Sequence, residues 1–130
     1  MPEMAEGRLT SLLRTLRAGG PTARRRALET LARRRERAAA EDVARLLRDP
    51  VPIVRAGAAE ALAALGTEAA VPVLLDALED RDADVRYWAA VALGNLASPS
   101  ANFALIRLAR RDPVAEVREA AREAIPKTAW

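Results

Sequence analysis

The sequence predicts an all-α solenoid of about four helix pairs. Apolar residues recur at helical spacing, and the same pattern returns along the chain after 31 or 32 residues. The composition agrees, because hydrophobic residues make up 51 % of the chain while aromatic residues make up only 3 %. The apolar content is therefore mostly Ala, Leu and Val, which favours closely packed helices over a β-sandwich.

The repeat is defined by residues that keep one phase along the chain. Val54-Arg55 returns as Val85-Arg86 after 31 residues and as Val117-Arg118 after a further 32. Three apolar columns run through four copies at a spacing of 31: Leu12, Val43, Leu74 and Leu105; Leu13, Ala44, Leu75 and Ile106; Leu16, Leu47, Leu78 and Ala109. One helix pair cannot bury its apolar faces alone, so we expect the pairs to stack.

Turn-forming residues separate the helices in order along the chain: Gly19-Gly20-Pro21, Asp49-Pro50, Gly66-Thr67, Ser98-Pro99 and Asp112-Pro113. An Asp or Ser before Pro predicts an N-cap followed by proline at the first helical position. Pro72 falls in the first turn of its helix, where proline is tolerated. The predicted first helices of the pairs span about 4–17, 39–48, 69–79 and 100–110. The predicted second helices span about 21–35, 51–65, 82–97 and 114–125.

At this length we expect one domain over residues 1–130, with repeats at approximately 4–35, 39–65, 69–97 and 100–125. The net charge of +3 is unevenly distributed. Residues 1–37 hold ten Arg and four Glu, a net charge of +6, whereas the remainder carries −3. The sequence therefore predicts one basic end and one mildly acidic end.

A motif of the form D-P-x-x-x-V-R-x-x-A-A-x-A-L spans residues 49–62 and returns in part at 82–94. It resembles HEAT repeats, in particular the short HEAT-like class also found in phycobilin lyases. The resemblance covers residues 39–126 well and residues 1–38 weakly, because Ala23 stands where the Val would be and Leu28 replaces an Ala. A divergent first repeat is typical of an N-terminal cap.

The resemblance implies a right-handed α-α superhelix in which the second helix of each pair lines the concave face. It also implies that the Arg of each V-R pair bonds an Asp in a turn of its own or a neighbouring repeat. Arg55, Arg86 and Arg118 with Asp49, Asp80 and Asp112 would form that ladder. We therefore assign these six residues a structural role in preference to a ligand role.

The outward side of the second helices is the candidate binding surface, because Ala58, Leu62 and Leu65 occupy the inward side. The outward positions in the four copies are Arg25, Arg26, Glu29 and Arg33; Ala56, Gly57, Glu60 and Ala64; Tyr87, Trp88, Val91 and Asn95; Glu119, Ala120, Glu123 and Lys127. Such a face runs from an Arg-rich end over a shallow Ala-Gly patch to aromatic residues and then to an acidic end.

Trp, Tyr and Arg are the residue types that contribute most to interface energies. We therefore predict a non-enzymatic scaffold that binds a protein or peptide. Its expected binding residues are Tyr87, Trp88, Val91, Asn95, Arg25, Arg26, Arg33 and Glu60. The competing interpretation of Trp88 is ordinary packing over the groove between repeats.

The arginines at 24–26, 33–35 and 37 allow three interpretations: a solvated face, a site for an acidic protein, or a site for nucleic acid. DNA-repair glycosylases of related HEAT-like architecture hold duplex DNA, but no aromatic residues interleave with these arginines for base stacking. An accessory or lyase-like role for a chromophore protein is a third function, which rests on the resemblance alone.

Enzymatic sites find little support in the residues. The chain has no His and no Cys, which removes the usual nucleophile–base pairs and most transition-metal ligands. Asp80, Asp82 and Asp84 imitate the start of a calcium loop, but Val85 and Val91 stand where that loop needs Gly and Glu. We therefore expect no catalytic residues, no metal and no cofactor. Without a signal peptide or a long apolar stretch, we expect a cytoplasmic protein.

Overall fold

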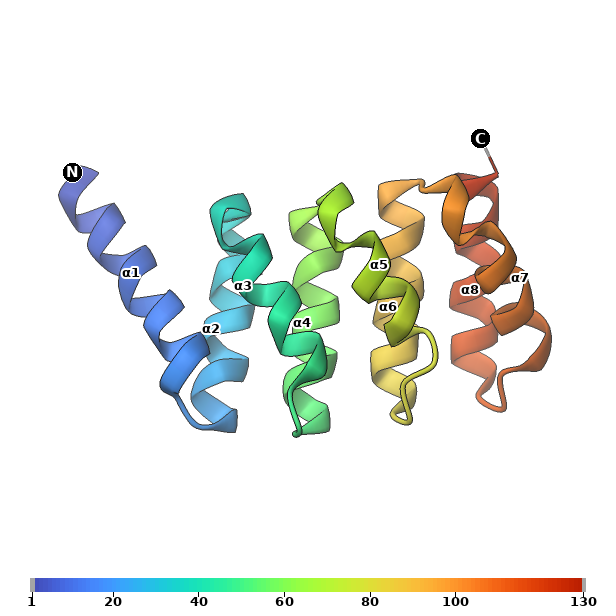
Figure 1. The fold of residues 1–130 in the computed structure, drawn as a ribbon, viewed down its shortest axis with the longest axis horizontal. Coiled ribbons are helices and arrows are strands. Elements are labelled where there is room, and N and C mark those ends of the chain that lie inside the picture. The colour runs from blue at the N-terminus through green and yellow to red at the C-terminus, as the bar shows by residue number, and fades with distance from the viewer. Residues whose placement is uncertain (1, 130) are drawn as a thin grey trace.

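The computed structural model describes residues 2–129 of the chain, and the side chains from residue 7 onward. Over this range the chain forms the helices α1–α8 and short 3-10 helices, with no β-strand. The helices form two layers along an elongated molecule, and the two chain ends lie at its opposite ends (Figure 1). The predicted all-α solenoid of four helix pairs is confirmed.

The first helices of the four pairs form one layer: α1 (Pro2–Ala18), α3 (Ala40–Arg45), α5 (Val71–Ala77) and α7 (Asn102–Arg111). The second helices form the other: α2 (Pro21–Arg34), α4 (Pro52–Leu65), α6 (Ala83–Leu96) and α8 (Ala115–Thr128). Short 3-10 helices precede α3, α5 and α7, at Arg37–Ala39, Glu68–Ala70 and Pro99–Ala101. A fourth 3-10 helix follows α3, at Leu46–Arg48.

The two layers pack differently. Helices α2, α4, α6 and α8 each contact the next member of their row extensively, whereas the first helices pack mainly on their own partner. Fully buried alanines, such as Ala58 in α4 and Ala89 in α6, leave room for backbones to approach closely. The second helices therefore make one continuous layer.

The repeat columns form the core. Val43, Leu74 and Leu105 of the first helices are fully buried, and so are Val54 and Val85 at the start of second helices. Leu62 and Leu93 are at most 1 % exposed, as the inward assignment of these positions predicts. The apolar columns read from the sequence thus mark the contacts within and between repeats.

The start of the second helices differs from the prediction. Asp49 and Asp112 are not N-caps: α4 starts at Pro52 and α8 at Ala115, each three residues after the Asp. The Asp49 carboxylate instead accepts a hydrogen bond from the backbone N–H of Val51 at 2.9 Å, two residues along the chain. This local Asp turn competes with helix initiation and postpones the first helical turn.

The last helix continues through Pro126 to Thr128, beyond the predicted end at residue 125. Proline removes one backbone donor there, but the Ile125 carbonyl still accepts a hydrogen bond from Ala129 N–H at 3.0 Å. In the final turn of a helix the missing donor affects only one bond, so the helix does not break.

Three second helices end on a residue in the left-handed conformation: Arg35 at φ 53°, Gly66 at φ 54° and Ala97 at φ 52°. These residues are spaced by 31 and so occupy one repeat position. Glycine adopts this conformation without a Cβ clash, whereas Arg35 and Ala97 do not have that freedom. The same left-handed turn therefore recurs at one repeat position with three different residues.

Candidate interaction surface

The outward side of the second helices makes a surface that crosses all four pairs. We call it the second-helix surface and define it by the expected binding residues that lie on it: Arg25, Arg26, Arg33, Glu60, Tyr87, Trp88, Val91 and Asn95. Because α2, α4 and α6 pack side by side, residues from three repeats lie next to one another on this surface.

Tyr87 and Trp88 lie in the first half of α6 and contact each other edge to face. Their ring centroids are 5.1 Å apart and the ring planes are inclined by 87°. Both side chains are half-buried and pack against the core. Part of each ring therefore packs against the core while the rest faces solvent. The arrangement allows Trp88 both the packing role and the binding role considered from the sequence.

Trp88 occupies the repeat position of Gly57, which shows where it points. A Cβ placed on Gly57 would lie 2.9 Å from Cδ of Arg25 and 3.2 Å from a methyl carbon of Leu28, both on the preceding second helix. The repeat therefore predicts that Trp88 lies on the side of α6 that faces α4, the second helix with which α6 packs.

The shallow patch expected at Ala56 and Gly57 is absent: that expectation was wrong. Ala56 is 8 % exposed and Gly57 is buried. The side chain of Arg25 lies over Gly57, and its guanidinium reaches Glu29 at 3.2 Å and Glu60 at 3.9 Å. An arginine stem can cover apolar surface while its charge stays in solvent, which one-helix geometry does not reveal.

Of the other expected binding residues, some make contacts within the fold and others face solvent. Asn95 donates a hydrogen bond from Nδ2 to the Ala63 carbonyl at 3.0 Å, which satisfies a backbone acceptor in the last turn of α4. Val91 is half-buried against the core, whereas Arg26 and Arg33 are exposed. The structure thus brings Tyr87, Trp88 and Val91 together on α6 and places the arginines on α2.

The Arg–Asp ladder expected between repeats is present: Arg55 and Arg86 each bind the carboxylate of the following turn and a backbone carbonyl of their own turn. Nε and Nη2 of Arg55 contact the Asp80 carboxylate at 2.8 and 3.2 Å, and Nη1 donates to the Asp49 carbonyl at 2.9 Å. Arg86 repeats these contacts with the Asp112 carboxylate at 2.7 and 3.1 Å. Each arginine thus joins the turn of its own repeat to the turn of the next repeat.

Arg24 belongs to the basic cluster by its place in the sequence, but the structure places its side chain on the ladder. Its Nη1 contacts the Asp49 carboxylate at 2.6 Å and its Nη2 donates to the Arg17 carbonyl at 3.1 Å. The signal was present in the sequence, because Arg24 lies 31 residues before Arg55. At the other end, Arg118 donates to the Asp112 carbonyl at 2.8 Å.

Asp112 is an acid of the ladder whose side chain is almost fully buried, 3 % exposed. Burial alone would raise the pKa of its carboxyl, but the hydrogen bonds from Arg86 and from Val114 N–H outweigh burial, together with the charges of Arg86 and Arg118. The pKa of Asp112 is therefore lowered from its ordinary value of 3.8.

Comparison with known proteins decides the family. The family profile of HEAT repeats matches residues 9–90 and 52–126. The chain belongs to the HEAT-repeat family. No curated protein matches it.

Among solved structures, an engineered protein, a target of the Northeast Structural Genomics Consortium, resembles this HEAT-repeat chain with a TM-score of 0.70. The two are 24 % identical, and the match covers 90 % of this chain and 60 % of that protein. The HEAT-repeat chain therefore spans less than two thirds of the engineered protein, and the likeness concerns the fold alone.

The carboxylates that imitate a calcium loop serve the HEAT-repeat turns. Asp80 accepts hydrogen bonds from Arg55 and from Asp82 N–H, and Asp82 caps α6 by accepting from Asp84 N–H at 2.9 Å and from Val85 N–H at 3.3 Å. Within the described residues, no group of three or more acidic side chains gathers closely enough to hold a metal ion.

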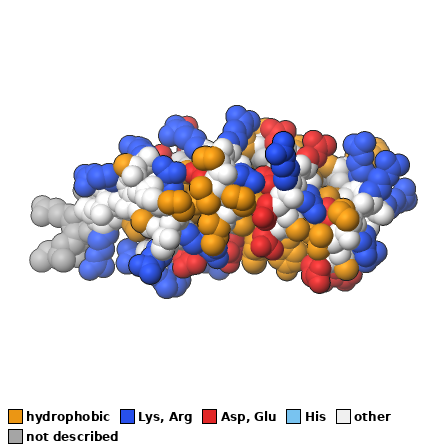
Figure 2. All heavy atoms as spheres, turned by 90° about the horizontal axis from the view of Figure 1, so that it is seen from below, with side chains coloured by type: hydrophobic (Ala, Val, Ile, Leu, Met, Phe, Trp, Pro, Cys, Tyr) orange, Lys and Arg blue, Asp and Glu red, His pale blue; other side chains and the backbone are white. Residues whose placement is uncertain are grey.

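The charge of the HEAT-repeat solenoid differs from the expected basic-to-acidic gradient. Figure 2 shows basic side chains towards both ends of the molecule, with acidic and hydrophobic ones between them. Residues 102–129 hold six basic and four acidic residues, and the arginines of α7 and α8 lie near the C-terminal end. The net charge of −3 over residues 38–130 does not reveal this basic end, because the range also contains the acidic turns of the middle repeats.

None of the helices in the described part of the chain is both long enough and apolar enough to cross a membrane.

Proposed function

We propose that this HEAT-repeat scaffold binds a protein or peptide on the second-helix surface, without catalysing a reaction. The observation that carries the proposal is the edge-to-face pair of half-buried Tyr87 and Trp88 on α6. Half-buried aromatic rings are held rigidly by the core, so they lose little side-chain entropy when a partner covers their free part.

The charges of α2 suggest the partner's character. Arg26 and Arg33 of α2 are exposed, while Arg25 pairs with Glu29 and Glu60. Helix α4 lies between α2 and the aromatic pair on α6, so exposed arginines on α2 would guide an acidic segment towards the second-helix surface as a whole and raise its association rate. We also propose that the four pairs act as one domain over residues 1–130, and the cytoplasmic location remains a prediction.

The test is affinity capture from cells that express the protein, with wild type, Trp88→Ala and Phe103→Ala compared by quantitative mass spectrometry. Phe103 is a suitable control because its ring is 87 % exposed on α7, in the other layer. A partner of the second-helix surface should be lost with Trp88→Ala and retained with Phe103→Ala. Capture of the same proteins by all three would contradict the proposal.

Nucleic acid is the rival ligand, favoured by the exposed arginines of α2. Binding through phosphates should weaken steeply with salt and with each arginine removed, and should not depend on Trp88. Duplex DNA binding at physiological salt that is lost in an Arg26→Ala/Arg33→Ala variant and kept in Trp88→Ala would replace the protein-binding proposal.

A further inference from the structure

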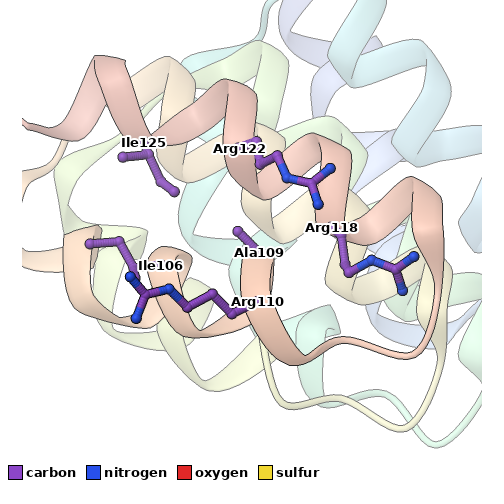
Figure 3. A pocket seen from close by; sticks show the side chains of 6 residues that line it. All are labelled: Ile106, Ala109, Arg110, Arg118, Arg122 and Ile125. Carbon is purple, nitrogen blue, oxygen red and sulfur yellow. The ribbon is translucent and has the colours of Figure 1, made fainter.

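The C-terminal end of the solenoid carries a hollow with a volume of about 500 Å³. Six side chains of α7 and α8 line it: Ile106, Ala109, Arg110, Arg118, Arg122 and Ile125. Figure 3 shows the two isoleucines and the three arginines around this hollow, on the outer side of the last helix pair. We call it the end face. It is separate from the second-helix surface.

The end face repeats the positions that earlier pairs use to contact the next pair. Ile106 and Ala109 correspond to Leu75 and Leu78, which line a groove together with residues of α7. Ile125 corresponds to Leu93, which is fully buried. The end face is thus built as a stacking surface with the apolar positions of an internal repeat.

Arg118 occupies the ladder position of Arg55 and Arg86 on this face. In both earlier repeats the guanidinium binds a carboxylate from the following turn, Asp80 or Asp112. Among the described residues Arg118 contacts only the Asp112 carbonyl of its own turn. Within the described part of the chain, this guanidinium is therefore positioned for a carboxylate that residues 7–129 do not supply.

The end face also departs from a plain repeat in a way that selects its ligand. Arg122 stands at the position of Ala59 and Ala90, which are fully buried in the earlier repeats. Together with Arg110 and Arg118 it surrounds the apolar hollow with positive charge. Arg122 already pairs with Glu119 at 3.1 Å, whereas among the described residues Arg110 and Arg118 have no carboxylate partner. A segment that covers Ile106 and Ile125 must supply carboxylates to Arg110 and Arg118, or their charges would be buried without partners.

A second copy of the chain does not meet this requirement. In a head-to-tail stack, the turn between α1 and α2 of the next copy would meet the end face. That turn has Ala18 at the repeat position where the later turns have Asp49, Asp80 and Asp112. That end is itself basic, with Arg8, Arg14 and Arg17 on α1. Stacking two end faces on each other would oppose arginine to arginine.

We propose that the end face binds an acidic helical segment of another protein, with one carboxylate on Arg118 and a second near Arg110. The apolar side of that segment covers Ile106 and Ile125. Recognition then continues the interface that joins the repeats, with the acid supplied by the partner.

The chain itself contains a suitable probe. Residues 68–97 hold six acidic and two basic residues, and their turn presents Asp80 to the arginine of the preceding repeat. A fluorescently labelled peptide of these residues would be titrated with the full chain, as wild type, Arg118→Ala and Arg122→Ala, and anisotropy would be recorded. The controls are Arg37→Ala, an exposed arginine near the other end, and Trp88→Ala on the second-helix surface.

We expect the peptide to bind the wild type, and Arg118→Ala to weaken binding by about 10- to 100-fold, the effect of losing a charge-assisted bidentate contact. Asp80→Asn in the peptide should have a similar effect, Arg122→Ala should weaken binding less, and the two controls should bind as wild type does. Loss of binding in Trp88→Ala would mean that the peptide occupies the second-helix surface, and would overturn the proposal.

Three further results would also overturn it. No binding up to about 1 mM, or equal binding to Arg118→Ala, would show that the end face does not recognise the carboxylate. Tighter binding to Arg122→Ala would identify a plain stacking surface that needs no acidic partner. Random duplex DNA that displaces the peptide at a lower concentration than unlabelled peptide would assign the face to nucleic acid.

Discussion

Replacing Arg86 with alanine should be among the most destabilising changes to a polar residue in this protein. Arg86 makes two contacts with the Asp112 carboxylate and donates to the carbonyls of Asp80 at 2.9 Å and Arg81 at 3.2 Å. The side chains of Arg86 and Asp112 are 12 % and 3 % exposed. Removing the guanidinium leaves a buried carboxylate without its charge partner, which typically costs about 3–5 kcal/mol.

Arg118→Ala is the matched control, because it removes the same residue from the same repeat position. Arg118 makes one hydrogen bond, at 2.8 Å to the Asp112 carbonyl, and no carboxylate of the described residues binds it. The loss of one such bond corresponds to about 0.5–1.5 kcal/mol. We therefore expect Arg86→Ala to exceed Arg118→Ala by about 2–4 kcal/mol in the free energy of unfolding.

The assay is urea denaturation followed by circular dichroism, combined with native-state hydrogen exchange. Because stability in a solenoid is a sum over repeats and their interfaces, Arg86→Ala should raise exchange in α7 and α8 more than in α2. Equal effects of the two substitutions, or uniform exchange along the chain, would refute the view that Arg86 and Asp112 couple the last two repeats.

Three further predictions follow from the packing, the helix ends and the ladder. Leu93→Ala should lower the free energy of unfolding by about 2–5 kcal/mol, while Glu60→Ala should stay within about 0.5 kcal/mol; equal shifts in thermal melting would mean that the helix faces are reversed. Ala97→Gly should stabilise the protein and Gly66→Ala should destabilise it, each by about 1 kcal/mol in denaturant titrations, because both residues have positive φ; opposite signs would contradict the strain. Because the pKa of Asp112 is lowered in the folded state, its ionised carboxyl stabilises the fold above pH 3.8, and this stabilisation is lost as pH falls through the lower folded-state pKa. Asp112→Asn should therefore reduce the loss of stability with falling pH, measured by denaturation between pH 2 and 5.

Much of the fold could be predicted because the repeat carries the same information several times. The columns through Val43, Leu74 and Leu105 fix both the helical period and the inward side, and all three side chains are fully buried. The ladder of Arg55 and Arg86 could be anticipated for the same reason, since each partner pair recurs with the repeat.

The surface was harder to predict, because it depends on side chains that cross between repeats. Helical geometry placed Ala56 and Gly57 outward, but Arg25 of the preceding helix covers Gly57. The aromatic pair could be predicted from residue type, while its half-burial depends on packing against the core, which residue type does not reveal. The end face was missed because Arg118 matches a ladder position and Ile125 a core position, so the repeat pattern gave no sign that the described residues leave a hollow there.

The most direct test of the binding proposal is the affinity of the captured partner for wild type, Trp88→Ala and Trp88→Phe, measured by titration calorimetry at two salt concentrations. The phenylalanine variant retains an aromatic ring at this position of α6 and so controls for loss of packing. An aromatic anchor predicts a loss of about 2 kcal/mol or more for Trp88→Ala, roughly 30-fold in Kd, and a smaller loss for Trp88→Phe. Unchanged affinity in Trp88→Ala, with a fold as stable as wild type at the temperature of the assay, would show that the second-helix surface is not where this protein binds.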